Sequence, residues 1–175
     1  MDTNVLIDQI LSEYRSSLKE DFDKYRNHVY RVYHLCILLD TNPEYRDRYA
    51  IAAAFHDLGI WTNNTFDYLQ PSIALAKEWL VRENKSNWSD EISLMIDMHH
   101  KVTRYSGLFE TTVEVFRKAD WIDVSFGMLS FGVSRSQLRT LTKAFPTRGF
   151  HRFLVRKTLQ NFIRHPFTPL PMFRK

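Results

Sequence analysis

Apolar residues recur along the chain at the spacing of amphipathic helices. Within residues 3–18 the period is about 3.6 residues, set by the apolar positions Val5, Leu6, Ile10 and Leu11. Within residues 21–40 a single helical face is formed by positions at spacings i, i+4, i+7 and i+11, namely His28, Val32, Leu35 and Leu39. We expect a helix over each range. The second carries a histidine on an otherwise apolar face.

Helix-breaking residues divide the rest of the chain. Asn42-Pro43 separates the second helix from a third over residues 44–57, where the run Ala52-Ala53-Ala54-Phe55 suits close packing and Gly59 fits a C-terminal stop. Residues 60–70 are predicted to form a loop that covers the functional site considered below. Further helices are predicted from Pro71, from Ser89 to His99-His100, and over 110–124, 134–144 and 149–164, before a proline-broken tail.

Composition supports this helical interpretation. The 175 residues include only five Gly and six Pro, which is too few turn residues for a β-sandwich. Hydrophobic residues make up 44% and aromatic residues 14%, enough for one sizeable core. We therefore predict a single all-α domain over residues 1–175, a bundle of roughly seven to eight helices.

The expected compartment is the cytoplasm. The single cysteine, Cys36, lies in an apolar run and has no second cysteine for a disulfide. The first residues, MDTNVLIDQILSEY, carry acids where a secretory signal carries basic residues, and no long uncharged apolar run follows. The sequence predicts no transmembrane segment.

Charge is divided unevenly along the chain. Residues 124–175 contain ten Lys or Arg and no acid, whereas residues 1–123 hold the other 14 basic residues and all 20 acids. The basic part is suited to anions such as phosphate, nucleic acid or acidic lipid. Packing of this part on the acidic remainder, within the chain or across a homodimer, explains the same division. For the basic amphipathic stretch 150–164 we favour a last bundle helix over contact with nucleic acid or an anionic membrane.

Four polar residues stand at positions that otherwise look buried. His28 interrupts an apolar face, His56-Asp57 ends the alanine-rich helix, and Asp120 lies inside an apolar helix. A buried carboxylate is unfavourable unless it is paired or binds a cation. One shared divalent ion would satisfy all of them.

The order and context of these residues resemble the HD superfamily of metal-dependent phosphohydrolases. The matching segments are NHVYRVYHL around His28, AAAFHDLGI around the doublet, IDMHH at 96–100 and RKAD at 117–120. The resemblance covers about residues 20–125 and leaves a basic C-terminal helical extension, about 126–175, unaccounted for. It implies an HD-type helical bundle in which His28, His56, Asp57 and Asp120 hold one divalent metal ion. Their mixed N/O site suits Mn, Fe, Co, Ni, Zn or Mg.

The resemblance also assigns roles near the metal. It implies that Asp57, with His99 or His100, takes part in catalysis, and the sequence leaves open which histidine faces the site, since the two point about 100° apart on a helix. Members with two metals use an extra histidine after the doublet, and none lies between His56 and His99, so one metal is expected. Asp123 is interpreted as supporting the metal ligands or as a surface residue. The motifs of three well-known branches (stringent-response hydrolases, 5′-nucleotidases and cyclic-di-GMP hydrolases) are absent.

Candidate contacts for a substrate phosphate are cationic residues near these segments: Arg31, Lys101, Arg104 and Lys118. Arg31 is equally compatible with a surface ion pair, and for each of Lys101, Arg104 and Lys118 taken singly we favour an ordinary exposed position. The expected function is hydrolysis of a phosphate ester of a small molecule, such as a nucleotide, by a metal-activated water. Two alternatives remain: an HD-fold hydratase of a small nitrogen compound such as cyanamide, and a non-catalytic nucleotide-binding regulatory module.

Overall fold

The computed structural model describes residues 2–63, 67–153, 155, 156 and 159. Within these ranges the chain contains helices and no strand, which confirms the predicted all-α bundle of seven to eight helices. Seven α-helices have nine or more residues: α1 (Val5–Glu13), α3 (Phe22–Leu39), α4 (Arg46–Phe55), α6 (Leu69–Arg82), α7 (Ser89–Met98), α8 (Glu110–Val124) and α9 (Arg135–Ala144). Two further helices have a single turn, α2 (Arg15–Leu18) and α5 (Gly59–Thr62).

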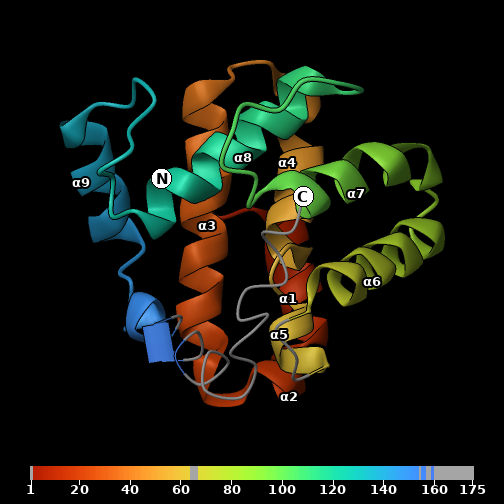
Figure 1. Ribbon diagram of the computed structural model, residues 1–175. Coiled ribbons are helices and arrows are strands. Elements are labelled where there is room, and N and C mark those ends of the chain that lie inside the picture. Colours follow the sequence, from red (N-terminus) through yellow and green to blue (C-terminus); the bar gives the residue numbers. More distant parts are fainter. Residues whose placement is uncertain (1, 64–66, 154, 157–158, 160–175) are drawn as a thin grey trace.

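The centre of the bundle is formed by α3, α4 and α8 (Figure 1). Helix α3 packs against α4 and, most extensively, against α8, while α1 lies against α4. The alanine run of α4 is fully buried, because small side chains let neighbouring helices approach closely. Figure 1 shows α6 and α7 on one side of these helices and α9 on the other. Side chains that point inward from the three central helices therefore meet in the core.

Helix boundaries follow local capping chemistry. The side chain of Asn4 accepts the N–H groups of Leu6 and Ile7 at the start of α1, and Ser134 forms a capping box with Gln137 at the start of α9. The helix predicted over 3–18 is interrupted at Tyr14, where α1 ends and α2 begins. Among the described residues, no helix combines the length and the apolar character needed to cross a bilayer.

One prediction between α4 and α6 is wrong. Gly59 does not stop a helix, because it begins the short helix α5. Residues 60–62 and 69–70 are not loop, since they belong to α5 and to the start of α6. A Cβ atom at this position would lie 2.5 Å from the carbonyl oxygen of Tyr68 and 3.0 Å from Oγ of Ser72. The N–H of Gly59 donates to that same Ser72 hydroxyl at 2.9 Å. Glycine is needed here for the close approach of α5 to α6.

A Gly59→Ala variant is therefore expected to be destabilised by about 1–3 kcal/mol, as in other overpacked cores. The nearest obstacle is a backbone carbonyl, so repacking of side chains cannot relieve the clash. Thermal or urea unfolding measures the effect. Thr62→Ala, in the same short helix at a half-buried position, is the control and should change stability by less than about 0.5 kcal/mol. Equal stability of the two variants would contradict the prediction.

Candidate metal centre

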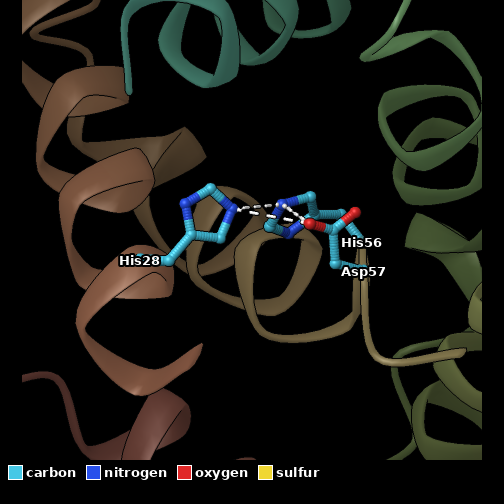
Figure 2. A group of neighbouring side chains, drawn as sticks. All are labelled: His28, His56 and Asp57. Atoms are coloured by element: carbon cyan, nitrogen blue, oxygen red, sulfur yellow. Dashed lines mark hydrogen bonds and ion pairs between the residues drawn. The ribbon is translucent and has the colours of Figure 1, made fainter. Parts of the chain in front are cut away.

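The residues singled out on three separate helices meet in the core. His28 lies in the middle of α3, His56 and Asp57 follow the last residue of α4, and Asp120 lies in α8. The Nε2 atoms of His28 and His56 are 2.9 Å apart. Oδ2 of Asp57 lies 3.7 Å from Nε2 of His28 and 3.5 Å from Nε2 of His56. Figure 2 shows His28 directed across the core toward His56 and Asp57.

Asp120 completes this group from the third helix. Its Oδ1 atom lies 3.6 Å from Nε2 of His28 and 3.7 Å from Nε2 of His56. All four side chains are at most 6% exposed. The structure thus brings together the four residues that the sequence nominated as metal ligands.

The three buried imidazoles are oriented in the same way. Nδ1 of His28 donates to Asp123, Nδ1 of His56 to the carbonyl of Ala53 at 2.8 Å, and Nδ1 of His99 to the carbonyl of Ile96 at 2.6 Å. Each Nδ1 proton is thus engaged outside the centre, and each Nε2 points into it; the Nε2 atoms of His28 and His56 share a hydrogen bond, whereas Nε2 of His99 has no hydrogen-bond partner among the described residues. Second partners of this kind hold metal-binding histidines in position in other proteins. Loss of the proton shared by His28 and His56 would leave the three Nε2 atoms oriented as metal ligands.

Several buried polar atoms at this centre lack a hydrogen-bond partner within the described part of the chain. They are Oδ1 of Asp57, Oδ1 of Asp120 and Nε2 of His99. An unsatisfied buried polar atom is unfavourable, and a cation between the two carboxylates and the imidazoles would satisfy them. Ligand atoms at about 2.1 Å from one ion are separated from each other by about 3.0–3.4 Å. The observed separations of 2.9–3.7 Å fit a divalent ion after small adjustments.

Asp123 lies behind His28 and is buried. Its Oδ2 accepts the Nδ1 proton of His28 at 2.7 Å, and the guanidinium of Arg31 donates to both carboxylate oxygens. Burial opposes ionisation of Asp123, but His28 and Arg31 hold its pKa well below the usual range. An ionised carboxylate at this position fixes the His28 ring with Nε2 toward the centre. The sequence left open whether Asp123 supports a metal ligand or lies on the surface, and the geometry favours support of His28.

The charges of the centre are strongly coupled. Burial lowers the pKa of His56, but the carboxylates of Asp57 and Asp120 outweigh it and raise the pKa to about 9. Burial and the neighbouring His56 lower the pKa of His28 below its ordinary value and outweigh Asp123 and Asp120, which raise it. Without a cation, one proton on His56 therefore sits between the two carboxylates. A divalent ion would replace that proton.

This exchange predicts that the stability of the metal-free fold and the stabilisation by a bound cation change with pH in opposite directions. The raised pKa of His56 contributes stability to the metal-free fold that is full below its ordinary value of 6.5 and is lost as pH rises through about 9. A cation competes with the proton, so its stabilising effect should grow over the same interval. We expect the increase in thermal midpoint caused by Mn²⁺ to be larger at the upper end of this window than at its lower end. A pH-independent increase would contradict the exchange.

The histidine pair after α7 reaches the same centre from the side of Asp57. Nε2 of the fully buried His99 lies 3.5 Å from Oδ1 of Asp57. His100 is partly exposed and contacts the Tyr68 hydroxyl through Nε2. Burial and neighbouring His99 lower the pKa of His100 to about 3, so its imidazole is neutral at physiological pH. Asp57, His99 and His100 form a second group whose ligand atoms lie within 4.8 Å of one another.

The C-terminal segment packs onto the centre, which the sequence interpretation missed. The ring of Phe150 is fully buried and stacks on His28 at 4.0 Å, and His151 contacts the carbonyl of Asp123 through Nε2 at 2.9 Å. Phe153 stacks on Trp61 at 5.1 Å. Tyr68, the partner of His100, was also missed. The one sequence signal for these residues is the aromatic spacing of 150–153, since contacts between distant segments leave no local pattern.

Three of the four predicted phosphate contacts do not reach the metal centre. Arg31 is 1% exposed and is held by Asp123 and by the carbonyl of Phe145, which its Nη1 contacts at 3.0 Å. Arg104 pairs with Glu110 at the first residue of α8, about 15 Å along the helix from Asp120. Lys118 pairs with Glu114 and points about 200° around α8 from Asp120. The structure therefore brings none of these three to the centre.

Lys101 directly follows the histidine pair. Its carbonyl accepts the side chains of Arg117 and Trp121, which ties this turn to α8. Its half-buried side chain belongs to the segment that carries His99 and His100. Of the four predicted cations, Lys101 is the one that directly follows the histidine pair in the sequence.

Comparison of the chain with protein-family models, with curated proteins and with solved structures finds no match.

Proposed function

We propose that the chain is a metal-dependent hydrolase that holds one divalent ion through His28, His56, Asp57 and Asp120. The observation that carries the proposal is the convergence of these side chains in the core, with each imidazole Nδ1 occupied from outside and each Nε2 directed into the centre. A purely structural cluster would pair its carboxylates with donors. Here one oxygen of each of the two carboxylates has no partner among the described residues.

The surrounding residues divide the chemical tasks. Divalent ions in such N/O sites supply a nucleophilic water at neutral pH and offset charge on a substrate oxygen. Asp57 faces His28 and His56 with Oδ2 and His99 with Oδ1, so it links the ligand group to the histidine pair. His100, neutral and in contact with the Tyr68 hydroxyl, is suited to hold that hydroxyl in position beside the centre.

A phosphate ester is the substrate that we propose, on the basis of the HD-like motifs around His28, His56-Asp57 and Asp120. The test combines elemental analysis of the purified protein with turnover of p-nitrophenyl phosphate, nucleotides and sugar phosphates in the presence of Mn²⁺, Co²⁺, Ni²⁺, Zn²⁺ or Mg²⁺. His28→Ala should abolish metal-dependent turnover. His34→Ala, at a half-buried position on the same helix, should retain it. Equal activity of wild type and His28→Ala across the panel would refute the hydrolase.

The number of bound ions is a separate outcome. We expect one ion per chain, because His28, His56, Asp57 and Asp120 form one compact ligand set. A stoichiometry of two would instead fill the second group, Asp57 with His99 and His100, and would overturn the one-metal proposal while leaving the hydrolase intact.

One observation favours a second candidate function. Arg31 is held by Asp123 behind His28, and Arg104 and Lys118 pair with carboxylates away from the centre, so the three do not supply the cationic pocket that phosphate binding would use. A hydratase of a small neutral nitrogen compound needs no such pocket. Urea formation from cyanamide by wild type, without turnover of any phosphate ester, would assign this activity. Thermal stabilisation by a nucleotide without product would instead indicate a regulatory module.

A further inference from the structure

Residues 124–175, which contain no acid, carry positive charges, and the described ones do not contact the metal centre. Five of these described cations are exposed and form no ion pair with a carboxylate of the described residues: Arg135, Arg139, Lys143, Arg152 and Arg156. Arg148 is the exception, at 3.9 Å from Asp23. Every Asp and Glu of the chain lies within the described ranges. This side of the protein therefore presents net positive charge.

Large apolar side chains are exposed beside these cations. Phe126 is 71% exposed, and Val155 and Leu159 are each 59% exposed. Together with His151, Arg152 and Arg156 they line one open groove of about 350 Å³ whose walls are almost entirely apolar. We call these six residues the groove face. Met128, two residues beyond Phe126, is 82% exposed.

The groove face lies next to α9 rather than apart from it. A second cavity, of about 180 Å³, is lined both by Phe126 and His151 and by Leu138, Leu141 and Thr142 of α9. Figure 1 shows α9 and the segment after it on the same side of α3, away from α6 and α7. The unpaired cations of α9 and the apolar groove thus belong to one side of the molecule.

We propose that the groove face docks on an anionic lipid bilayer. Exposed apolar side chains beside basic residues match the two components of such a surface, hydrocarbon and acidic headgroups. Burial of one such side chain favours the bound state by about tenfold or more, and each Lys or Arg near an anionic surface by about fivefold. Several of each, acting together, are enough for reversible membrane binding.

Other partners of the groove face would match either its apolar side chains or its positive charge, but not both. A second copy of the chain docked through the same face would place like charges opposite each other. Nucleic acid would attract the cations but offers no hydrocarbon for Val155 and Leu159. Residues 160–175 contain three more basic residues and no acid, so they add to the positive charge instead of neutralising it.

Vesicle co-sedimentation of the full chain tests the proposal. We expect binding to vesicles of phosphatidylcholine with about 30% phosphatidylglycerol to exceed binding to pure phosphatidylcholine by about tenfold or more. Binding should weaken as salt rises from about 0.05 to 0.5 M. Arg152→Glu and Val155→Asp should each reduce it by at least about fivefold. Unchanged thermal midpoints would show that both variants are folded.

The matched controls lie on α6, on the other side of the bundle. Lys77 is exposed, and Val81 is 65% exposed, so Lys77→Glu and Val81→Asp repeat both kinds of substitution outside the groove face. Both should bind anionic vesicles as wild type does. Absence of vesicle binding, equal binding to neutral vesicles, or equal loss in the controls would overturn the proposal.

Two further results would reassign the surface. Binding to duplex DNA that Arg152→Glu weakens and Val155→Asp does not would assign it to nucleic acid. A concentration-dependent dimer that Val155→Asp dissociates would assign it to a second copy. Neither measurement uses the metal centre, so the membrane proposal stands or falls separately from the hydrolase.

Discussion

Replacement of Asp57 by asparagine is expected to weaken divalent-metal binding by more than about a hundredfold and to remove metal-dependent turnover. Loss of a residue that only orients a ligand lowers metal affinity by about 10–100-fold, and Asp57 is itself a proposed ligand. Its Oδ2 atom lies within 3.7 Å of two imidazole nitrogens, and it is the residue shared by both candidate ligand groups. Metal titration by calorimetry and elemental analysis measure the loss.

The same variant separates metal binding from folding. Without a cation, Asp57 lies beside the protonated His56, so the variant loses one carboxylate of a buried charge pair and keeps Asp120 as the other. We therefore expect the chelator-treated variant to melt below chelator-treated wild type. Only wild type should gain stability from Mn²⁺. Asp90→Asn, at an exposed position, is the control. A variant that still responds to Mn²⁺ as wild type does would contradict Asp57 as a ligand.

Replacement of Asp123 by alanine is expected to destabilise the fold by about 3–5 kcal/mol, because it leaves the buried guanidinium of Arg31 without its partner. The variant also releases Nδ1 of His28, so metal affinity should fall by about 10–100-fold. Urea unfolding and metal titration measure the two effects. Asp123→Asn, which keeps the shape of the side chain, should lose less stability but still bind metal more weakly.

Two comparisons sharpen this prediction. Asp23→Ala breaks an exposed carboxylate–arginine contact with Arg148 and should change stability by less than about 1 kcal/mol. The double variant Arg31→Met, Asp123→Leu removes both buried charges and should be more stable than Asp123→Ala. If Asp123→Ala and Asp23→Ala were equally stable, the buried ion pair would have no structural role.

The sequence was informative where a polar residue interrupts a periodic apolar pattern. His28, His56, Asp57 and Asp120 could be nominated because each stands among residues whose spacing already predicts burial. The choice between Asp120 and Asp123 depended on the resemblance, since the two are three residues apart on one face of α8. The structure brings both to His28 at different nitrogens, Asp120 near Nε2 and Asp123 at Nδ1.

The roles that could not be predicted depend on contacts between distant segments. Arg31 lies one turn after His28, so its charge was visible in the sequence, but its partner Asp123 is 92 residues away. The interpretation of residues 60–62 as loop failed because the close approach of α5 to α6 at Gly59 is a tertiary contact. The predicted last helix, 149–164, lies partly outside the described residues, and its described part includes the stacked Phe150.

The stacking of Phe150 on His28 has a consequence for how the protein matures. His28 leaves the ribosome before the aromatic ring that covers it, which is synthesised more than a hundred residues later. Asp120 and Asp123, which contact the two nitrogens of the same imidazole, also emerge late. The cation pocket can therefore be assembled only after Asp120 and Phe150 have been translated, and a nascent chain that ends before residue 120 has no complete pocket to fill.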